Sequence, residues 1–364
     1  MKKVGVITFS GTSHNYGQIL QCYAMQLVLK QLGFQPFLIT FRNTRISFKV
    51  LSFSQKIIKI LGAVSYFIKK HTHATLSISL SPQNEVDRGF NNFISKHITT
   101  QHYGCLDLLY TNPPQADAYI CGSDQIWGTM TPLYYLDFVS KGGKKIAYAP
   151  SYGGGKLNLI DKFKLRWLIK DFSHISVREE DGVKICSECG RPDAIVVPDP
   201  TLIVDKESYR AIASNNKVPN KPYILVYMLK NTTDFDMEEL KKETKKKNLE
   251  IVYITANGLE DEYEKIYPNI DEWLGLMNNA TYVVTNSFHC TVFSIIFNKP
   301  FRVFYLIGEF AKMNLRISQL LLHYHLKHTE TYNFDSQINY EQTNRILAED
   351  RKKIQNMIKD WIIN

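Results

Sequence analysis

The sequence predicts an α/β fold of two doubly wound domains, whose parallel sheets face a central cleft. Three observations lead to this prediction. The chain of 364 residues is too long for one ordinary hydrophobic core. Short apolar, β-branched runs alternate with helical patterns, as in successive βαβ units. A polar stretch containing proline, residues 205–221, separates these runs into two sets.

The first βαβ unit is the clearest. The run VGVITF at 4–9 has the continuous apolar character of a strand buried on both faces. The polar loop SGTSHNYG follows at 10–17, and residues 18–32 then place apolar side chains at helical spacing as far as the stop signal Gly33. The run FLIT at 37–40 is the next strand, so the two strands are expected to be parallel.

The same alternation continues to the end of the chain. Further strands are expected at 118–121, 145–149, 174–177 and 194–197, and in the second set at 223–229, 251–255, 281–284 and 301–305. Helices are expected near 235–247, 271–278 and 290–297, with an amphipathic closing helix over about 340–362. We therefore expect an N-terminal domain over 1–205, a C-terminal domain over 206–335, and a segment 336–364 whose helix packs back on the N-terminal domain.

The positive charge lies almost entirely in the first quarter of the chain. The net charge is +9, and residues 1–84 contain ten lysines and arginines but no acidic residue. The other 280 residues contain 34 basic and 35 acidic side chains, a net charge of −1. This asymmetry indicates an anionic partner for the first quarter, such as a phosphorylated ligand, an anionic membrane surface or a nucleic acid.

A basic amphipathic segment, which we treat as an insertion over about 45–115, carries much of this charge. Its helical stripe consists of Ile57, Ile60, Leu61, Val64, Phe67 and Ile68, flanked by Lys56, Lys59, Lys69 and Lys70. One interpretation is a helix packed on the sheet with a solvated basic rim, and the other is a helix resting on an anionic membrane. The aromatic residues do not alternate with the lysines, so we expect no nucleic-acid partner.

Composition excludes several classes of protein. No apolar run approaches the roughly 20 residues that span a bilayer, and turn residues follow the start too early for a signal peptide. We therefore expect a cytoplasmic protein, with peripheral attachment to the inner face of the cytoplasmic membrane as an open alternative. Only Cys186 and Cys189 have metal-like spacing, and a closed zinc site needs four ligands, so no metal site is expected.

Candidate ligand-binding loops follow from the topology. Ligands of open α/β sheets bind beyond the carboxyl ends of the strands. This rule selects five loops, at 10–17, 122–128, 150–155, 178–181 and 285–290. The first contains His14 and the last contains His289, so two histidines lie on strand-to-helix loops of opposite domains.

Arg178 directly follows a strand, where its guanidinium could bind a carboxylate or phosphate or instead form a salt bridge with Glu179 or Glu180. The loop at 10–17 has two glycines and could hold a phosphate with its backbone N–H groups, or could be a plain tight turn. The sequence leaves both pairs of alternatives open.

With these residues in place, the chain resembles the polysaccharide pyruvyl transferase family over nearly its full length. The stretches that carry the resemblance include HNYGQILQCYAMQLVLKQLG (14–33), ADAYICGSDQIW (116–127), ISVREEDG (175–182), DPTLIVD (199–205) and YVVTNSFHCTVFSIIFNKPF (282–301). The resemblance implies two Rossmann-like domains in a GT-B-like arrangement. It also implies transfer of the enolpyruvyl-derived group of phosphoenolpyruvate to two hydroxyls of a hexose, forming a ketal and releasing phosphate.

The resemblance also implies roles for individual residues. The N-terminal domain would hold the acceptor, a hexose-containing and lipid-linked glycan, and the C-terminal domain would hold the donor. His289 is the expected general acid or base, and no cofactor is expected beyond phosphoenolpyruvate as co-substrate. The expected substrate-binding residues are Asn15, Tyr16, Gly17, Asp124, Gln125, Arg178, Asn286, Ser287, Lys312, Asn314 and Arg316.

The sequence departs from the family at one position. Many members carry an arginine two residues before this histidine, whereas this chain has Ser287 there. If the donor is the same, another cation must replace that arginine. Lys312 and Arg316, with Asn314 between them, are the expected replacements.

Two other interpretations remain. A glycosyltransferase using a nucleotide sugar could be built on the same two domains, with the 285–290 loop gripping the diphosphate. A membrane-associated scaffold without activity could also be consistent with the change at Ser287. Thermal stabilisation by a nucleoside diphosphate but not by phosphoenolpyruvate would favour the glycosyltransferase.

Overall fold

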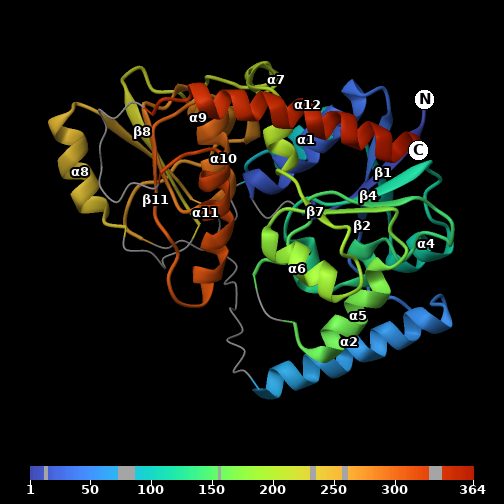
Figure 1. Cartoon of the computed structure of the whole chain (residues 1–364). Helices are drawn as coiled ribbons and strands as arrows, with labels where there is room; N and C mark the ends of the chain where they lie inside the picture. Colours follow the sequence, from blue (N-terminus) through green and yellow to red (C-terminus); the bar gives the residue numbers. More distant parts are fainter. Residues whose placement is uncertain (12–14, 73–86, 155–156, 230–234, 256–260, 328–337) are drawn as a thin grey trace.

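Two parallel β-sheets, one in each half of the chain, form the frame of the computed structural model (Figure 1). The structure describes residues 1–364 except 12–14, 73–86, 155–156, 230–234, 256–260 and 328–337. Within these described ranges, no helix is both long enough and apolar enough to cross a membrane.

The first sheet has seven strands in the order β3-β2-β1-β4-β5-β6-β7, and every neighbouring pair is parallel. The strands are β1 (Lys3–Ile7), β2 (Gln35–Phe41), β3 (Thr100–Tyr103), β4 (Ala118–Cys121), β5 (Lys145–Ala147), β6 (His174–Val177) and β7 (Ile195–Val196). β1 lies inside the sheet between β2 and β4 and is fully buried from Val4 to Ile7, which explains its continuous apolar run.

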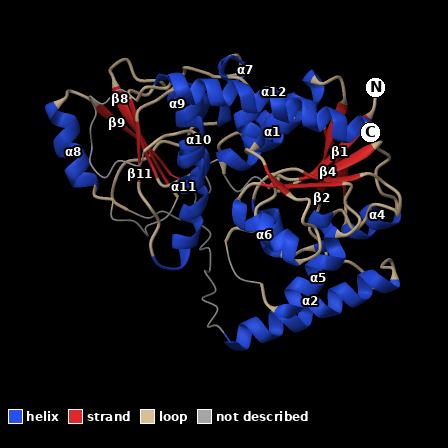
Figure 2. Ribbon diagram, viewed as in Figure 1, coloured by secondary structure: helices blue, strands red, loops and turns tan. Residues whose placement is uncertain are grey.

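Helices cover both faces of this sheet (Figure 2). The helices of this half are α1 (Tyr16–Gln31), α2 (Phe53–Thr72), α3 (Phe90–His97), α4 (Leu106–Thr111), α5 (Leu159–Ile169) and α6 (Glu180–Glu188), with 3-10 turns η1 (Gln125–Thr129), η2 (Pro132–Tyr135) and η3 (Pro200–Ile203). α1 packs on one face with Val4 and Val6, while α5 packs on the other with Ile7. The two faces thus belong to two different hydrophobic clusters.

The second sheet has four parallel strands in the order β11-β10-β8-β9. They are β8 (Tyr223–Met228), β9 (Glu250–Thr255), β10 (Tyr282–Thr285) and β11 (Phe301–Val303). The helices of this half are α8 (Met237–Lys246), α9 (Ile270–Asn279), α10 (Phe288–Ile296) and α11 (Asn314–His323), with the turn η4 (Gly308–Met313) before α11.

The predicted fold class is confirmed: the chain is α/β, with two Rossmann-like parallel sheets in a GT-B-like arrangement. All ten strands expected from apolar runs are present. The sequence did not predict β3, because its residues TQHY are exposed except Tyr103 and form no apolar run. It also did not predict α5, and it assigned the start of α6 to a loop.

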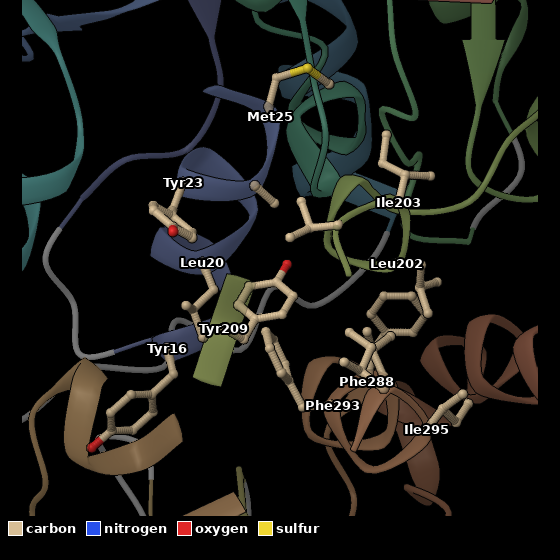
Figure 3. Packing of buried hydrophobic residues seen from close by; sticks show 14 of the residues in the cluster. Tyr16, Leu20, Tyr23, Met25, Leu202, Ile203, Tyr209, Phe288, Phe293 and Ile295 are labelled. Carbon is tan, nitrogen blue, oxygen red and sulfur yellow. The ribbon is translucent and has the colours of Figure 1, made fainter. Parts of the chain in front are cut away.

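The connection between the two halves is largely exposed and is anchored by one buried side chain. It contains α7 (Lys206–Arg210), whose Tyr209 is fully buried. The Tyr209 ring meets Phe293 of α10 edge to face, with 4.9 Å between ring centroids, and lies against Tyr23 of α1 (Figure 3). Its hydroxyl donates a hydrogen bond to the carbonyl of Thr201, 2.9 Å away. Tyr209 therefore packs helices of both halves together.

The C-terminal helix α12 (Glu341–Ile363) crosses both halves (Figure 1). At its C-terminal end Trp361 stacks on His174 of the first sheet, with ring centroids 4.8 Å apart. At its N-terminal end Thr343 donates a hydrogen bond to the carbonyl of Tyr324, which follows α11. The helix was expected to pack on the N-terminal half, and the structure adds this second contact.

Helix α2 contains the apolar stripe found in the sequence, but the first of the two interpretations, a helix packed on the sheet, does not describe it. It packs against α5, and most of its apolar stripe is exposed, with 54% of Ile60 and 63% of Phe67 accessible to solvent. Leu61 is partly buried. The side chains of Ile68, Lys69 and Lys70 lie outside the described residues. A helical stripe has the same period whether it faces a core or solvent, so the sequence could not distinguish the two cases.

We expect Tyr209 to control the stability of the junction. Tyr209→Ala should lower the free energy of unfolding by about 3–5 kcal/mol, because it leaves a cavity between the halves. Tyr209→Phe keeps the ring and loses one hydrogen bond, so it should cost only about 1 kcal/mol. Urea unfolding followed by tryptophan fluorescence measures both, and equal losses in the two variants would contradict the packing role.

Candidate active site

The loop after β10 places His289 where the two halves meet. Ser287 is the N-cap of α10, and its hydroxyl accepts a hydrogen bond from the backbone N–H of Cys290 at 3.4 Å. The Ser287 N–H in turn donates to the hydroxyl of Thr285. Serine is well suited to this capping position. His289 therefore lies in the first turn of α10, with 11% of its side chain exposed.

A buried carboxylate from the first half faces this histidine. Nε2 of His289 lies 3.7 Å from Oδ2 of Asp199, an ion-pair distance that is longer than a hydrogen bond. The same nitrogen is buried and has no hydrogen-bond partner among the described residues. A protonated imidazole at this position would therefore be paired with the Asp199 carboxylate.

Asp199 is held in place by three further residues. Its Oδ2 accepts hydrogen bonds from the Ser123 hydroxyl at 2.8 Å and from Arg178 at 3.0 Å. Its Oδ1 accepts from the backbone N–H and the hydroxyl of Thr201. Burial opposes ionisation of Asp199, but His289, Arg178 and the Thr201 N–H together hold its pKa well below its usual range. The carboxylate is therefore ionised at neutral pH.

Gly17 allows His289 to occupy its position. A Cβ atom built at Gly17 would lie 2.2 Å from both Cγ and Nδ1 of the imidazole. Any side chain at residue 17 would therefore push the ring away from its place. Gly17 was expected at the site, and its role in the structure is to make room for the imidazole against α1.

Two arginines approach the ring of Phe288, the residue before His289. The guanidinium carbon of Arg178 lies 4.6 Å from the ring centroid, and that of Arg316 lies 5.6 Å away. Both residues are less than 10% exposed. Two cations on one aromatic ring give this part of the site a strong positive field.

The two arginines differ in how their charge is balanced. Arg178 forms ion pairs with Asp199 and Glu179, so the salt bridge that the sequence left open is present. Arg316 has no carboxylate within ion-pair distance among the described residues, and its Nε has no hydrogen-bond partner there. With its amide oxygen turned toward Arg316, Gln125 accepts hydrogen bonds from Nη1 and Nη2 at 3.3 and 3.2 Å. A neutral amide leaves the positive charge of Arg316 uncompensated.

Burial and the repulsion from Arg178 lower the pKa of Arg316 to about 10. The carboxylates of Glu179, Asp124 and Asp199 offset these effects only in part, and an anion bound beside Arg316 would supply further opposite charge. Arg316 thus has the electrostatic character of an anion-binding residue.

Most of the expected site residues line one cavity of about 70 Å³. From the first half these are Asn15, Asp124 and Gln125, and from the second half Asn286, Ser287, His289, Asn314 and Arg316. A larger cavity of about 410 Å³ adjoins it, lined by Arg178 and Asp199 among others, and the two cavities share Phe288 and Arg316. Residues from both sequence halves therefore form one continuous site.

Several of these side chains also have structural tasks. Asn15 caps α1 by accepting from the N–H of Gln18, and Asn286 accepts from the N–H of Leu229 at 2.8 Å. Asn314 bonds both the N–H and the carbonyl of Leu306, so its amide fixes the loop before α11.

Asp124 has φ of 68° and ψ of 179°, a backbone conformation that residues other than glycine rarely adopt. Strain of this kind persists where the surroundings fix the residue, and it concentrates at functional sites. Asp124 also accepts a hydrogen bond from the N–H of Gln125 through its side chain, which orients the start of η1.

Two expected residues lie elsewhere. Tyr16 is fully buried, stacks on Trp273 and donates a hydrogen bond to the carbonyl of Pro268, so it packs the halves together and does not line the cavity. Lys312 is exposed and lies over Gly154 beside a smaller cavity. Of the two cations proposed to replace the family arginine, only Arg316 lines the cavity of His289. His14 lies outside the described residues.

Asp199 was not among the predicted site residues. The motif PDPT directly follows the strand predicted at 194–197, so the rule that selected the five loops could also have selected this one. Asp199 and His289 are 90 positions apart in the sequence, and no local sequence pattern indicates that two such distant residues lie close together. The described residues contain no group of three or more potential metal ligands among His, Cys, Asp and Glu.

Solved structures with similar folds cover nearly the whole chain. A putative UDP-N-acetylglucosamine 2-epimerase from Listeria monocytogenes matches with a TM-score of 0.50 and 10% identity, over 98% of this chain and 95% of that one. The UDP-N-acetylglucosamine 2-epimerase from Rickettsia bellii has a TM-score of 0.49 and 14% identity, over 100% and 97% of the two chains. At such identities the likeness to the Listeria structure shows the fold alone. No curated protein matches the chain.

A family model gives the more specific result. The model described as polysaccharide pyruvyl transferase matches residues 15–306, a range that starts before α1 and ends after β11. This range includes Asp199, His289 and every strand of both sheets except β1. The chain belongs to the polysaccharide pyruvyl transferase family.

Proposed function

We propose that this protein transfers the enolpyruvyl-derived group of phosphoenolpyruvate to two hydroxyls of a hexose in a surface polysaccharide or its lipid-linked precursor. The product is a pyruvate ketal, and inorganic phosphate is released. The observation that carries the proposal is the pairing of His289 with the buried Asp199, next to Arg316, which forms no ion pair with the described residues. Family membership supports a polysaccharide acceptor.

The donor has two anionic groups, and the site has two guanidiniums. Guanidinium binds carboxylate and phosphate with paired N–H groups. We propose that Arg316 and Arg178 hold the carboxylate and phosphate of phosphoenolpyruvate beside Phe288. In this arrangement Arg316 replaces the arginine that many family members carry at the position of Ser287, and Ser287 instead caps α10.

His289 would begin the reaction as a general acid. Its protonated imidazole gives a proton to C3 of phosphoenolpyruvate, and C2 becomes an oxocarbenium ion that the first sugar hydroxyl attacks. The hydroxyl proton returns to His289. The C2–O bond to phosphate then breaks, and the second hydroxyl adds to C2 and gives its proton to the departing phosphate, which closes the ketal.

Asp199 would act through His289. Its carboxylate lies beside the imidazole and orients the ring for the proton transfer. We propose that no metal ion or further cofactor takes part, because protonation of an enol ether needs only acid catalysis. We place the reaction in the cytoplasm.

Replacing His289 should remove the chemistry while leaving binding intact. His289→Gln is expected to lower kcat by about 10²- to 10⁴-fold, because general acid catalysis contributes about this much. The assay measures phosphate released from phosphoenolpyruvate with a nitrophenyl hexoside, and mass spectrometry detects the ketal on the sugar. Wild-type turnover by this variant would refute the role of His289.

The wild-type protein also decides between the donors. Thermal stabilisation by phosphoenolpyruvate, with no stabilisation by nucleoside diphosphates, is the expected result. The reverse pattern, together with a hexose mass added to the acceptor, would identify a glycosyltransferase.

Gly17 tests whether the position of the imidazole matters. Gly17→Ala places a methyl group where the His289 ring lies, so kcat should fall by about tenfold or more, since small misplacements of catalytic groups are costly. Gly104→Ala is the matched control, because a Cβ atom there meets nothing within 4 Å. Equal kcat values for the two variants would show that the ring does not need its present position.

Arg316 should show opposite effects on stability and on donor binding. Arg316→Met removes a buried, uncompensated charge, so the free protein should gain about 1 kcal/mol or more in its free energy of unfolding. The same change removes charge-assisted hydrogen bonds to the donor, so the Kd for phosphoenolpyruvate should rise about 10- to 100-fold. Calorimetry and urea unfolding measure the two effects, and a loss of stability with unchanged donor affinity would show a purely structural arginine.

A further inference from the structure

The apolar stripe of α2 is largely exposed to solvent. The stripe consists of Phe53, Ile57, Ile60, Val64 and Phe67, which are 80, 41, 54, 43 and 63% exposed. Their spacings of four, three, four and three residues place all five on one side of the helix. A row of exposed large apolar residues on one helix usually marks an interaction surface.

Contacts on the other side of α2 fix this orientation. Ile58 is 3% exposed, and the Ser65 hydroxyl donates a hydrogen bond to Asp161 of α5 at 2.7 Å. Gly62 lies against the end of Lys164 of α5, because a Cβ atom at residue 62 would be 2.9 Å from its Nζ. α2 lies at the edge of the molecule beneath α5 (Figure 1). Among the described residues, the buried contacts of α2 come from the side that carries Ile58, Gly62 and Ser65.

Basic residues are concentrated on α2 and on the segment before it. Arg42, Arg45, Lys49, Lys56 and Lys59 lie on α2 or on the segment leading into it, and residues 1–84 contain no acidic side chain. In the part of the chain that the structure describes, none of these five cations forms an ion pair with a carboxylate. Lys59 lies 4.4 Å above the exposed ring of Phe48. The surface therefore offers apolar contact and positive charge together.

We propose that α2 docks this protein onto an anionic lipid bilayer. The helix, about 30 Å long at 1.5 Å per residue, would lie in the plane of the interface. The stripe would enter the boundary between headgroups and acyl chains, and the five cations would meet the lipid phosphates. Docking of two copies of this chain through α2 is disfavoured, because it would bring their unpaired lysines together.

This docking does not depend on the reaction that the active site catalyses. If the acceptor is lipid-linked, membrane attachment raises its local concentration at the site. Binding to the bilayer and turnover of a soluble acceptor are therefore separate measurements, and one can fail while the other holds.

The test is co-sedimentation of the full chain with vesicles, without substrates. We expect binding to vesicles containing phosphatidylglycerol, weak binding to pure phosphatidylcholine, and loss of binding at 1 M salt, where the Debye length falls to about 3 Å. Ile60→Asp should weaken binding about 10- to 100-fold, because it removes an apolar side chain from the interface. Lys56→Gln should weaken it about fivefold, since one lysine near an anionic surface contributes about 1 kcal/mol.

Leu108→Asp is the matched control. Leu108 is 53% exposed on α4, and its substitution should leave vesicle binding unchanged. Phosphate release with a soluble acceptor should be unchanged in Ile60→Asp. Absence of binding to anionic vesicles would overturn the proposal, as would equal weakening by Leu108→Asp. A dimer seen by light scattering that Ile60→Asp abolishes, without vesicle binding, would assign the stripe to self-association instead.

Discussion

The buried carboxylate of Asp199 is the interaction on which the site depends. It accepts hydrogen bonds from Ser123 after β4 and from Arg178 after β6, and it faces His289 after β10. Three loops from two sheets therefore converge on one ionised group. A buried charge of this kind is stable only when it is fully paired, so the loops must keep their relative positions. The contacts that fix the loops around Asp199 also fix the orientation of the His289 imidazole.

The positive charge of the arginines near Phe288 explains how this chain can lack the arginine that many family members carry at the position of Ser287. Ser287 caps α10, and the cation comes instead from Arg316 of α11, a different element of the same half. Arg178 is neutralised by Asp199 and Glu179, whereas Arg316 forms no ion pair with the described residues. The free protein is thus less stable than it could be at the point where an anionic substrate would bind. Such a conflict between stability and binding is common at functional sites.

The two halves of the chain are joined by packing as well as by charge. Tyr209 from the connection and Tyr16 from α1 are both fully buried among residues of the other half. α12 adds contacts to each half along its length. α2 is the exception, because it uses one narrow side for packing and leaves its larger apolar side exposed. The exposed side of α2 is therefore available for contact with a partner.

The sequence by itself determined the α/β class, ten of the eleven strands and the loops that carry His289, Arg178 and Asn15. Apolar runs and helical periods are local signals, and parallel sheets place strand-end loops on one edge whatever their order along the chain. Only the tertiary structure decided that Asp199 faces His289, that Arg316 rather than Lys312 lines the cavity, and that Tyr16 packs against Trp273. It also decided that the stripe of α2 faces outward. These outcomes depend on which distant surfaces meet, and periodicity along one segment contains no information about the segment that lies opposite.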